Sequence, residues 1–284
     1  MNTIFYEETT NQILKSIDIP PQPQILRIVM AEQQKNYPDL KKIADAVVKD
    51  VGLSAAMLRA ANSPAFALRQ KVTSISKAVM LLGMNNAISL ITGLSLRMVM
   101  SGKGKIRLER FWDTASDTAI ICSILAKRFN VLVADQAYIL GLFHDCGIPL
   151  LIQRFDNYID ILKKGNANTE EQITVIEDRE LKTNHSVVGY IIARSWFLSE
   201  EIREIILHHH NEALFVNHKN NNDDVLVKQV GLLILSEYLC HLYHRESKDL
   251  IWQRVGKQIM ECFELTENCV SDLSEDMNDI LSSI

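Results

Sequence analysis

Residues that interrupt regular structure are scarce in this sequence. Its 284 residues include 11 glycines and six prolines, which fall mainly between the apolar segments. The five cysteines are scattered, odd in number and never spaced as Cys-x-x-Cys: Cys122, Cys146, Cys240, Cys262 and Cys269. This usage excludes a disulfide framework and a zinc knuckle, and it predicts reduced thiols in a cytoplasmic protein.

Membrane-spanning and secretory signals are also weak. Charged residues such as Asp117, Lys127, Lys228 and Glu237 interrupt the apolar segments, so we expect no membrane span. The opening MNTIFYEETT has neither the basic region nor the apolar run of a signal peptide. We therefore expect a cytoplasmic protein that does not bind membranes.

A broad basic surface is missing as well. The net charge is −5, and residues 261–284 carry seven acidic side chains and no lysine or arginine. The rest of the chain is close to neutral, which argues against binding to a nucleic-acid backbone. One basic cluster stands out, Lys103, Lys105, Arg107 and Arg110, and we interpret it as a solvated linker and not an anion site.

Helical periodicity is present almost everywhere. Apolar residues recur at helical spacing, and no segment alternates as a half-buried strand would. Polar residues placed as N-caps, such as Asp39, Ser74 and Ser199, precede several of these segments. The sequence predicts an all-α protein of about a dozen helices.

Three histidine-containing segments carry the chemistry. His144-Asp145 ends an apolar helix, His185 opens another, and His208, His209 and His210 end a third. Imidazole and carboxylate groups are metal ligands, but a histidine at a helix C-terminus is also favoured by the helix dipole alone. Helical phase places His209 on the same face as three isoleucines, so it should be buried, whereas His208 should point away.

The order of these segments resembles the HDOD domain, a branch of the HD superfamily of metal-dependent phosphohydrolases. The second half contributes HD, then HSVVG, then WFLSEEIREIILHHH; the first half adds IPPQPQIL, KDVGLSAAMLRAANSP and SISKAVMLLG. The resemblance covers residues 15–240, and the Asn62-Ser63 and Leu82-Gly83 blocks separate HDOD from ordinary HD proteins. It implies a multi-helix HDOD architecture, in which an N-terminal helical bundle packs against an HD-like helical subdomain.

This architecture implies a division of the chain into four parts. We expect an N-terminal extension at 1–14, the N-terminal helical subdomain at 15–105, the HD-like subdomain at 106–245, and C-terminal helices with an acidic tail at 246–284. The boundary at 105 follows SGKGK, where two glycines and two lysines separate apolar segments.

Departures from the catalytic pattern of the HD superfamily bear on activity. Active members place a further histidine before the His-Asp pair and an aspartate on a later helix; the corresponding residues here are Thr114 and Glu237. A catalytic metal needs several fixed ligands and an open position. The resemblance therefore implies a vestigial cluster without metal, cofactor or catalytic residue, made of His144, Asp145, His185, His209 and His210, with Thr114 and Glu237 at the altered positions.

The function that follows is a non-enzymatic, bacterial signal-transduction protein that binds a separate protein partner or a small signal. Asn62, Ser63 and Phe66 are candidate contact residues; the simpler alternative is that they form a helix end and a loop. The alternative is a divergent HD-type phosphohydrolase acting on a nucleotide or cyclic dinucleotide, with Glu237 and a neighbouring histidine completing the site. A third reading is an adaptor that forms a homo-oligomer through its acidic C-terminal helix.

Overall fold

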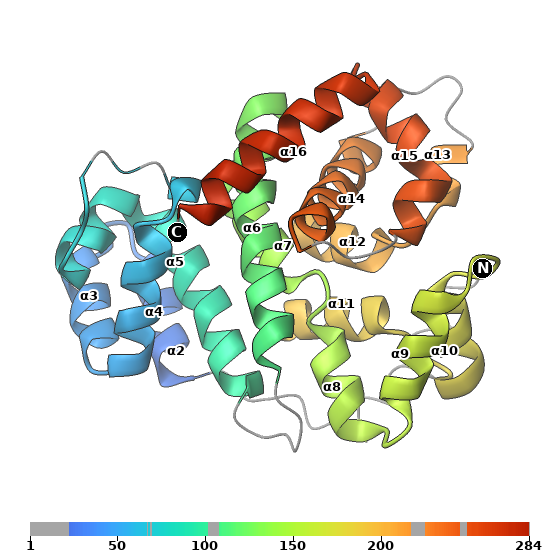
Figure 1. The fold of residues 1–284 in the computed structure, drawn as a ribbon. Helices are drawn as coiled ribbons and strands as arrows, with labels where there is room; N and C mark the ends of the chain where they lie inside the picture. Colours follow the sequence, from blue (N-terminus) through green and yellow to red (C-terminus); the bar gives the residue numbers. More distant parts are fainter. Residues whose placement is uncertain are drawn as a thin grey trace. The chain divides into compact units, whose positions relative to one another are not determined.

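The described residues of the protein fold into helices joined by turns and loops, with no strand among them (Figure 1). A computed structural model describes residues 23–66, 68, 70–101, 108–216, 225–244 and 249–283. The expected extension at 1–14 and the basic residues of 102–107 lie outside them. The prediction of an all-α fold is confirmed.

The chain divides into two compact units. Among the described residues, the first unit comprises residues within 23–142 together with 279–283, and the second comprises residues within 143–278. The helices of the first unit are α2 (Gln24–Gln33), α3 (Leu40–Val48), α4 (Val51–Ala61), η1 (Pro64–Phe66), α5 (Ile75–Ser101), α6 (Glu109–Phe129) and most of α7 (Ala134–Phe143).

The first unit is built on caps and breaks that are visible in the sequence. The Asp39 side chain accepts hydrogen bonds from the first backbone N–H groups of α3, as expected of an N-cap. Asp50 is the N-cap of α4 in the same way, its side chain accepting from the Leu53 N–H. Gly83 has φ 74° and ψ 177°, a conformation open to glycine, and it breaks α5 into two helical segments.

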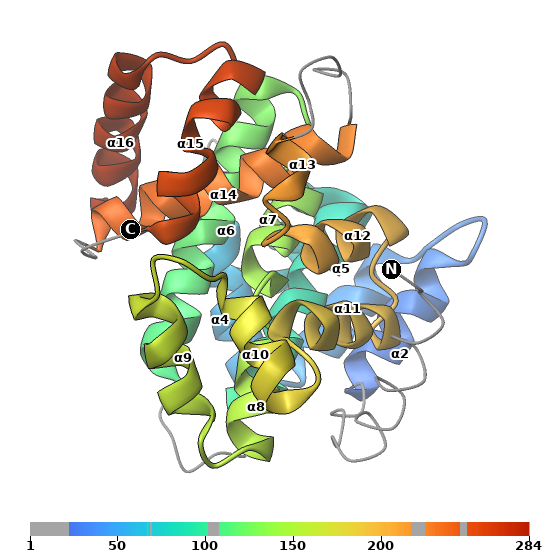
Figure 2. The same cartoon turned by 90° about the vertical axis from the view of Figure 1, so that its right-hand side faces the viewer.

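The second unit contains the remaining helices. They are α8 (Gly147–Arg154), α9 (Tyr158–Ala167), α10 (Ile173–Leu181), α11 (His185–Ser195), α12 (Glu200–His208), α13 (Ala213–Val216), α14 (Val225–Tyr243), α15 (Leu250–Cys262) and α16 (Glu267–Ser282), whose last residues belong to the first unit. Helix α11 contacts both α8 and α12, as Figure 2 shows. This layer of three helices holds the histidine segments.

The boundary between the two compact units lies in the chain beyond residue 105, and the four-part division of the sequence stays an expectation. The boundary falls after Leu142, because α6 and α7 pack with the N-terminal helices. Helix α6 contacts η1, and Gly141 of α7 lies so close to Ala119 of α6 that an added Cβ would be 2.6 Å from its Cα. The packing of α6 and α7 thus sets the boundary between the units, and the composition of the linker does not reveal it.

Two helices have the length and composition of a membrane span, Ile75–Met100 and Val225–Tyr243. The first contains residues 78–96, an uncharged stretch that our charge argument overlooked. In each helix 61% of the most apolar window is buried inside the structure, as in the core helices of a soluble protein. The break at Gly83 also divides the first of them.

Candidate functional site

The His-Asp pair lies in a tight turn between two helices. Helix α7 ends at Phe143, the Cys146 N–H donates to the Phe143 carbonyl at 2.9 Å, and α8 begins at Gly147. A Cβ on Gly147 would lie 2.1 Å from the carbonyl oxygen of His185, so only glycine permits this approach. The close contact brings the turn that carries Asp145 against the start of α11.

The other histidines come from the ends of α11 and α12. His185 is the first residue of α11, which is capped by the Asn184 side chain accepting from the Val187 N–H at 2.9 Å. His209 follows the last residue of α12 and is fully buried. His208 is partly exposed and pairs with Glu204 on its own helix. Helical phase therefore distinguished these two histidines correctly.

One carboxylate oxygen of Asp145 faces two imidazoles. Its Oδ1 lies 3.4 Å from His185 Nε2 and 3.3 Å from His209 Nε2. The His210 ring lies beside both, with centroid distances of 4.8 Å to His185 and 4.2 Å to His209. One ligand-type atom from each of these four residues lies within 4.8 Å of the others. We call Asp145, His185, His209 and His210 the four-ligand cluster.

Hydrogen bonds on the outer side of each ring orient two of these imidazoles. His185 Nδ1 lies 2.7 Å from Glu177 Oε2, and His209 Nδ1 lies 2.7 Å from the carbonyl oxygen of Ile206. A carboxylate or carbonyl oxygen only accepts, so in the neutral rings Nδ1 carries the proton and Nε2 presents a lone pair. Both Nε2 lone pairs then point toward Asp145 Oδ1.

These converging atoms fit a divalent cation. Among the described residues, Asp145 Oδ1, His185 Nε2 and His209 Nε2 are buried and have no hydrogen-bond partner. Buried acceptors that face one another without a donor are costly. Ligand atoms about 2.0–2.2 Å from one ion lie roughly 3–3.5 Å apart, which matches the distances from Asp145 Oδ1 to His185 Nε2 and His209 Nε2. The imidazoles also have the oriented outer hydrogen bonds that metal-binding histidines usually make.

A second group of polar side chains shares Asp145 and has a protonated histidine, His144, at its centre. His144 Nε2 lies 3.4 Å from Asp145 Oδ2 and 3.2 Å from Glu237 Oε1. Although burial disfavours the charged ring, these two carboxylates hold the pKa of His144 well above its ordinary value. Burial opposes ionisation of Asp145, yet His144 keeps the pKa of Asp145 well below its usual range. The His144 imidazolium thus sits between two carboxylates.

The remaining cluster histidines differ in charge. Burial works against protonation of His185, but the Glu177 carboxylate raises the pKa of its ring above the ordinary 6.5. Burial and the neighbouring rings of His209 and His185 lower the pKa of His210 well below 6.5. His210 is therefore neutral at physiological pH, which is the form that binds metals.

The other residues predicted for the site lie in the first unit. Thr114 is partly exposed on α6. The Asn62 amide donates to the carbonyls of Leu58 and Val72 at 2.8 and 2.9 Å and accepts from the Val72 N–H at 2.7 Å, so it joins two backbone segments. Ser63 is buried, and Phe66 packs against Tyr138 with a centroid distance of 5.3 Å.

Sequence reasoning missed Glu177, the fully buried partner of His185. A signal was present: Ile173, Ile176 and Glu177 stand at i, i+3 and i+4, so the glutamate shares the apolar face of its helix. A charged residue at a buried position must have partners. That position should have marked Glu177 as part of a polar cluster.

Comparison with known proteins agrees with this arrangement. The HDOD domain family model matches residues 19–212, more than half of the chain. The chain belongs to the HDOD domain family. Among curated relatives of this HDOD protein, the uncharacterized protein YuxH of Bacillus subtilis (strain 168) is 29% identical over 115 residues. That match covers 40% of this chain and only 28% of the length of YuxH.

Solved structures share the fold of this HDOD protein. An HDOD domain protein of unknown function from Geobacter sulfurreducens has a TM-score of 0.65 at 19% identity, covering 98% of this chain and 99% of that one. A protein from Shewanella amazonensis SB2B, whose name proposes a phosphohydrolase, has a TM-score of 0.69 at 19% identity, covering 94% and 93%. At these identities the likeness concerns the fold alone.

Proposed function

We propose that this HDOD protein is a signal-transduction regulator that acts by binding and not by hydrolysis. The observation that carries the proposal is the burial of the cluster: the side chains of His185 and His209 have no exposed surface, and that of His144 is 6% exposed. Metal-dependent hydrolysis needs a phosphate and an attacking water at an open metal position. Because these histidines are closed off from solvent, a structural role is favoured over a catalytic one.

The four-ligand cluster would hold a cation as a structural element. Three imidazoles and one carboxylate suit zinc or another first-row transition ion better than magnesium or calcium, which prefer oxygen ligands. The bound ion would neutralise Asp145 and join the turn before α8 to the ends of α11 and α12. The departures at Thr114 and Glu237 predict an empty cluster, whereas the converging lone pairs give a physical reason to expect an ion.

The binding function would be directed at a separate protein or a small signal in the cytoplasm. The near-neutral charge outside the acidic C-terminal residues supports this over a nucleic-acid target. Of the proposed contact residues, Phe66 is partly exposed, while the Asn62 amide is occupied by backbone partners.

A second candidate function is a divergent phosphohydrolase. It is favoured by the complete set of four ligands, and by the partial exposure of Asp145 and Glu237, whose side chains are 24% and 12% exposed. A substrate phosphate and a water would have to approach the cluster past these two partly exposed carboxylates. An ion bound in the four-ligand cluster would there polarise a phosphate oxygen and activate a water.

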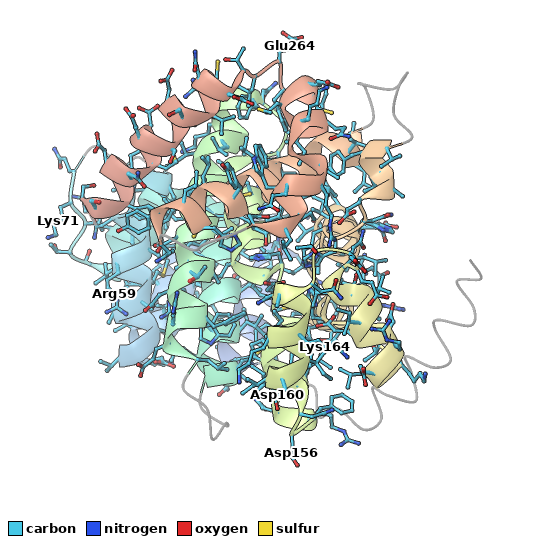
Figure 3. All side chains as sticks on the ribbon, turned by 45° about the vertical axis from the view of Figure 1, so that its right-hand side comes forward. Arg59, Lys71, Asp156, Asp160, Lys164 and Glu264 are labelled. Atoms are coloured by element: carbon cyan, nitrogen blue, oxygen red, sulfur yellow. The ribbon has the colours of Figure 1, made fainter. Side chains whose placement is uncertain are left out.

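Metal content and turnover together separate these functions. Untagged protein, purified without chelator, is analysed by elemental mass spectrometry, then assayed with nucleotides and cyclic dinucleotides in the presence of manganese, iron or zinc. The test variant is Asp145→Ala. Its control is Asp160→Ala on α9 in the same unit (Figure 3), where the aspartate side chain is 81% exposed and forms an ion pair with Lys163 at the surface.

Each result decides between the candidates. About one transition ion per chain without turnover supports a regulator with a structural cation. Neither metal nor turnover supports a regulator with the empty cluster that the altered positions predict. Turnover that Asp145→Ala abolishes and Asp160→Ala preserves would overturn the regulator in favour of the phosphohydrolase.

A further inference from the structure

A buried carboxylate with a buried tyrosine stands behind His185. Glu177 and Tyr158 have no exposed surface, and the Tyr158 hydroxyl donates to Glu177 Oε1 at 2.5 Å. The backbone N–H and the Nδ1–H of His185 both donate to Glu177 Oε2, at 3.0 and 2.7 Å. Helices α9, α10 and α11 each contribute one of these residues. Both oxygens of the carboxylate are therefore used.

These hydrogen bonds determine which ring nitrogen of His185 carries the proton. A carboxylate accepts and cannot donate, so Nδ1 must carry a proton, and the backbone bond anchors the same oxygen to the start of α11. The neutral ring then has its lone pair on Nε2, where Asp145 and His209 offer further acceptors and no described donor. In that form His185 can bind a cation through Nε2 while Nδ1–H stays paired with Glu177.

We infer that Glu177, held by Tyr158, is a positioning residue that fixes the tautomer and direction of His185 for a cation in the four-ligand cluster. The inference rests on the proposed cation site. Oriented carboxylate–histidine pairs raise the basicity of a metal-binding imidazole, and loss of such an outer partner weakens metal binding about 10–100-fold. Tyr158 contributes by occupying the second oxygen of Glu177, which keeps that carboxylate from turning away from His185.

Three variants test the role of this pair. Glu177→Gln keeps the shape and removes the charge, and Tyr158→Phe removes only the donated hydrogen bond. Glu180→Gln, also on α10, is the matched control because this exposed glutamate pairs with Lys164 at the surface. Far-UV circular dichroism and thermal unfolding establish whether each variant folds. Tyr158→Phe, the smallest change, provides the answer if Glu177→Gln unfolds.

Two measurements are made on each protein. Binding of Co²⁺ is measured by competition with a chromophoric chelator, and the tautomer of His185 is read from imidazole ¹⁵N shifts in metal-free protein at a pH where the ring is neutral. Wild type should bind one Co²⁺ and show the Nδ1–H form. Glu177→Gln should weaken Co²⁺ binding about 10–100-fold and Tyr158→Phe by a few-fold, while Glu180→Gln should match wild type within twofold.

The outcomes separate this inference from the cation site itself. No Co²⁺ bound by wild type overturns the cation site and the positioning role together. Co²⁺ bound by wild type and equally well by folded Glu177→Gln or Tyr158→Phe overturns the positioning role alone. An Nε2–H tautomer of His185 in metal-free wild type also overturns it, even when Co²⁺ binds.

Discussion

Gly147→Ala tests how the fold assembles the four-ligand cluster. The added Cβ would lie 2.1 Å from the His185 carbonyl oxygen and 2.9 Å from its carbonyl carbon. Contacts of this kind are normally at least about 3.4 Å, and the neighbouring atoms are backbone that cannot rotate away. The start of α8 must therefore move from α11 by about 1 Å, which also moves Asp145 away from His185.

The expected cost follows from two opposing effects. Overpacking of a close-packed interior costs about 1–3 kcal/mol and sometimes more. Alanine gains up to about 1 kcal/mol over glycine in a helix, but Gly147 is the first residue of α8, where that gain is smaller. We expect Gly147→Ala to lower the free energy of unfolding by about 2–3 kcal/mol in urea titrations, and to weaken Co²⁺ binding.

Gly52→Ala is the matched control in the first unit. Its added Cβ would meet only the flexible end of Met98 at 3.1 Å and an Asp50 carboxylate oxygen at 3.4 Å. The methionine can move, so this variant should be neutral or slightly stabilising. If Gly147→Ala were as stable as Gly52→Ala and bound Co²⁺ like wild type, the close approach of α8 to α11 would not be what assembles the cluster.

Three further predictions concern other parts of the chain. Phe197 has φ 59° and is 71% exposed, so Phe197→Gly should raise the free energy of unfolding by about 1 kcal/mol in urea titrations; a destabilised variant would contradict the backbone strain. Hydrogen bonds from Lys35 and then Lys42 lower the pKa of Glu32 to about 2 from 4.5, so its stabilisation is present above pH 4.5 and is lost as the pH falls toward 2. In Glu32→Gln the thermal-unfolding midpoint should therefore fall less steeply as the pH is lowered. If it falls as steeply as in wild type, this ion cluster is not a source of the acid sensitivity. Asn62→Ala should lower the free energy of unfolding by about 2 kcal/mol in urea titrations, because its hydrogen bonds to the backbone are lost. If the variant were as stable as wild type but no longer bound a partner, Asn62 would instead be a contact residue.

Local signals predicted the helices well where caps and breaks were strong. Asp39 and Ser199 cap helices as expected, and Gly83 has the positive φ that ends a helical segment. Helix α8 is harder to predict, because the apolar run continues through the turn at 144–146 and only backbone contacts show where one helix ends. Pro149 was compatible with that helix, since proline is tolerated in a first turn.

Predicting the site requires both the order of its motifs and the distances between helix ends, and a single sequence contains only the first. Motif order identified His144, Asp145, His185, His209 and His210 as one group. Comparison with the catalytic pattern then directed attention to the altered positions, Thr114 and Glu237, and away from the residues that remain. Whether remaining ligands form a set depends on distances between helix ends, and in this protein the approach of Gly147 to His185 sets one of them.

Glu177 shows how far the same reasoning extends once burial is taken into account. It lies eight residues before His185 and on a different helix, so no spacing rule for metal ligands reaches it. Its place on the apolar face of α10 nevertheless requires buried partners, and His185 and Tyr158 provide them. A charged residue in phase with an apolar stripe is therefore a useful guide to the outer partners of a polar cluster, which ligand motifs alone do not identify.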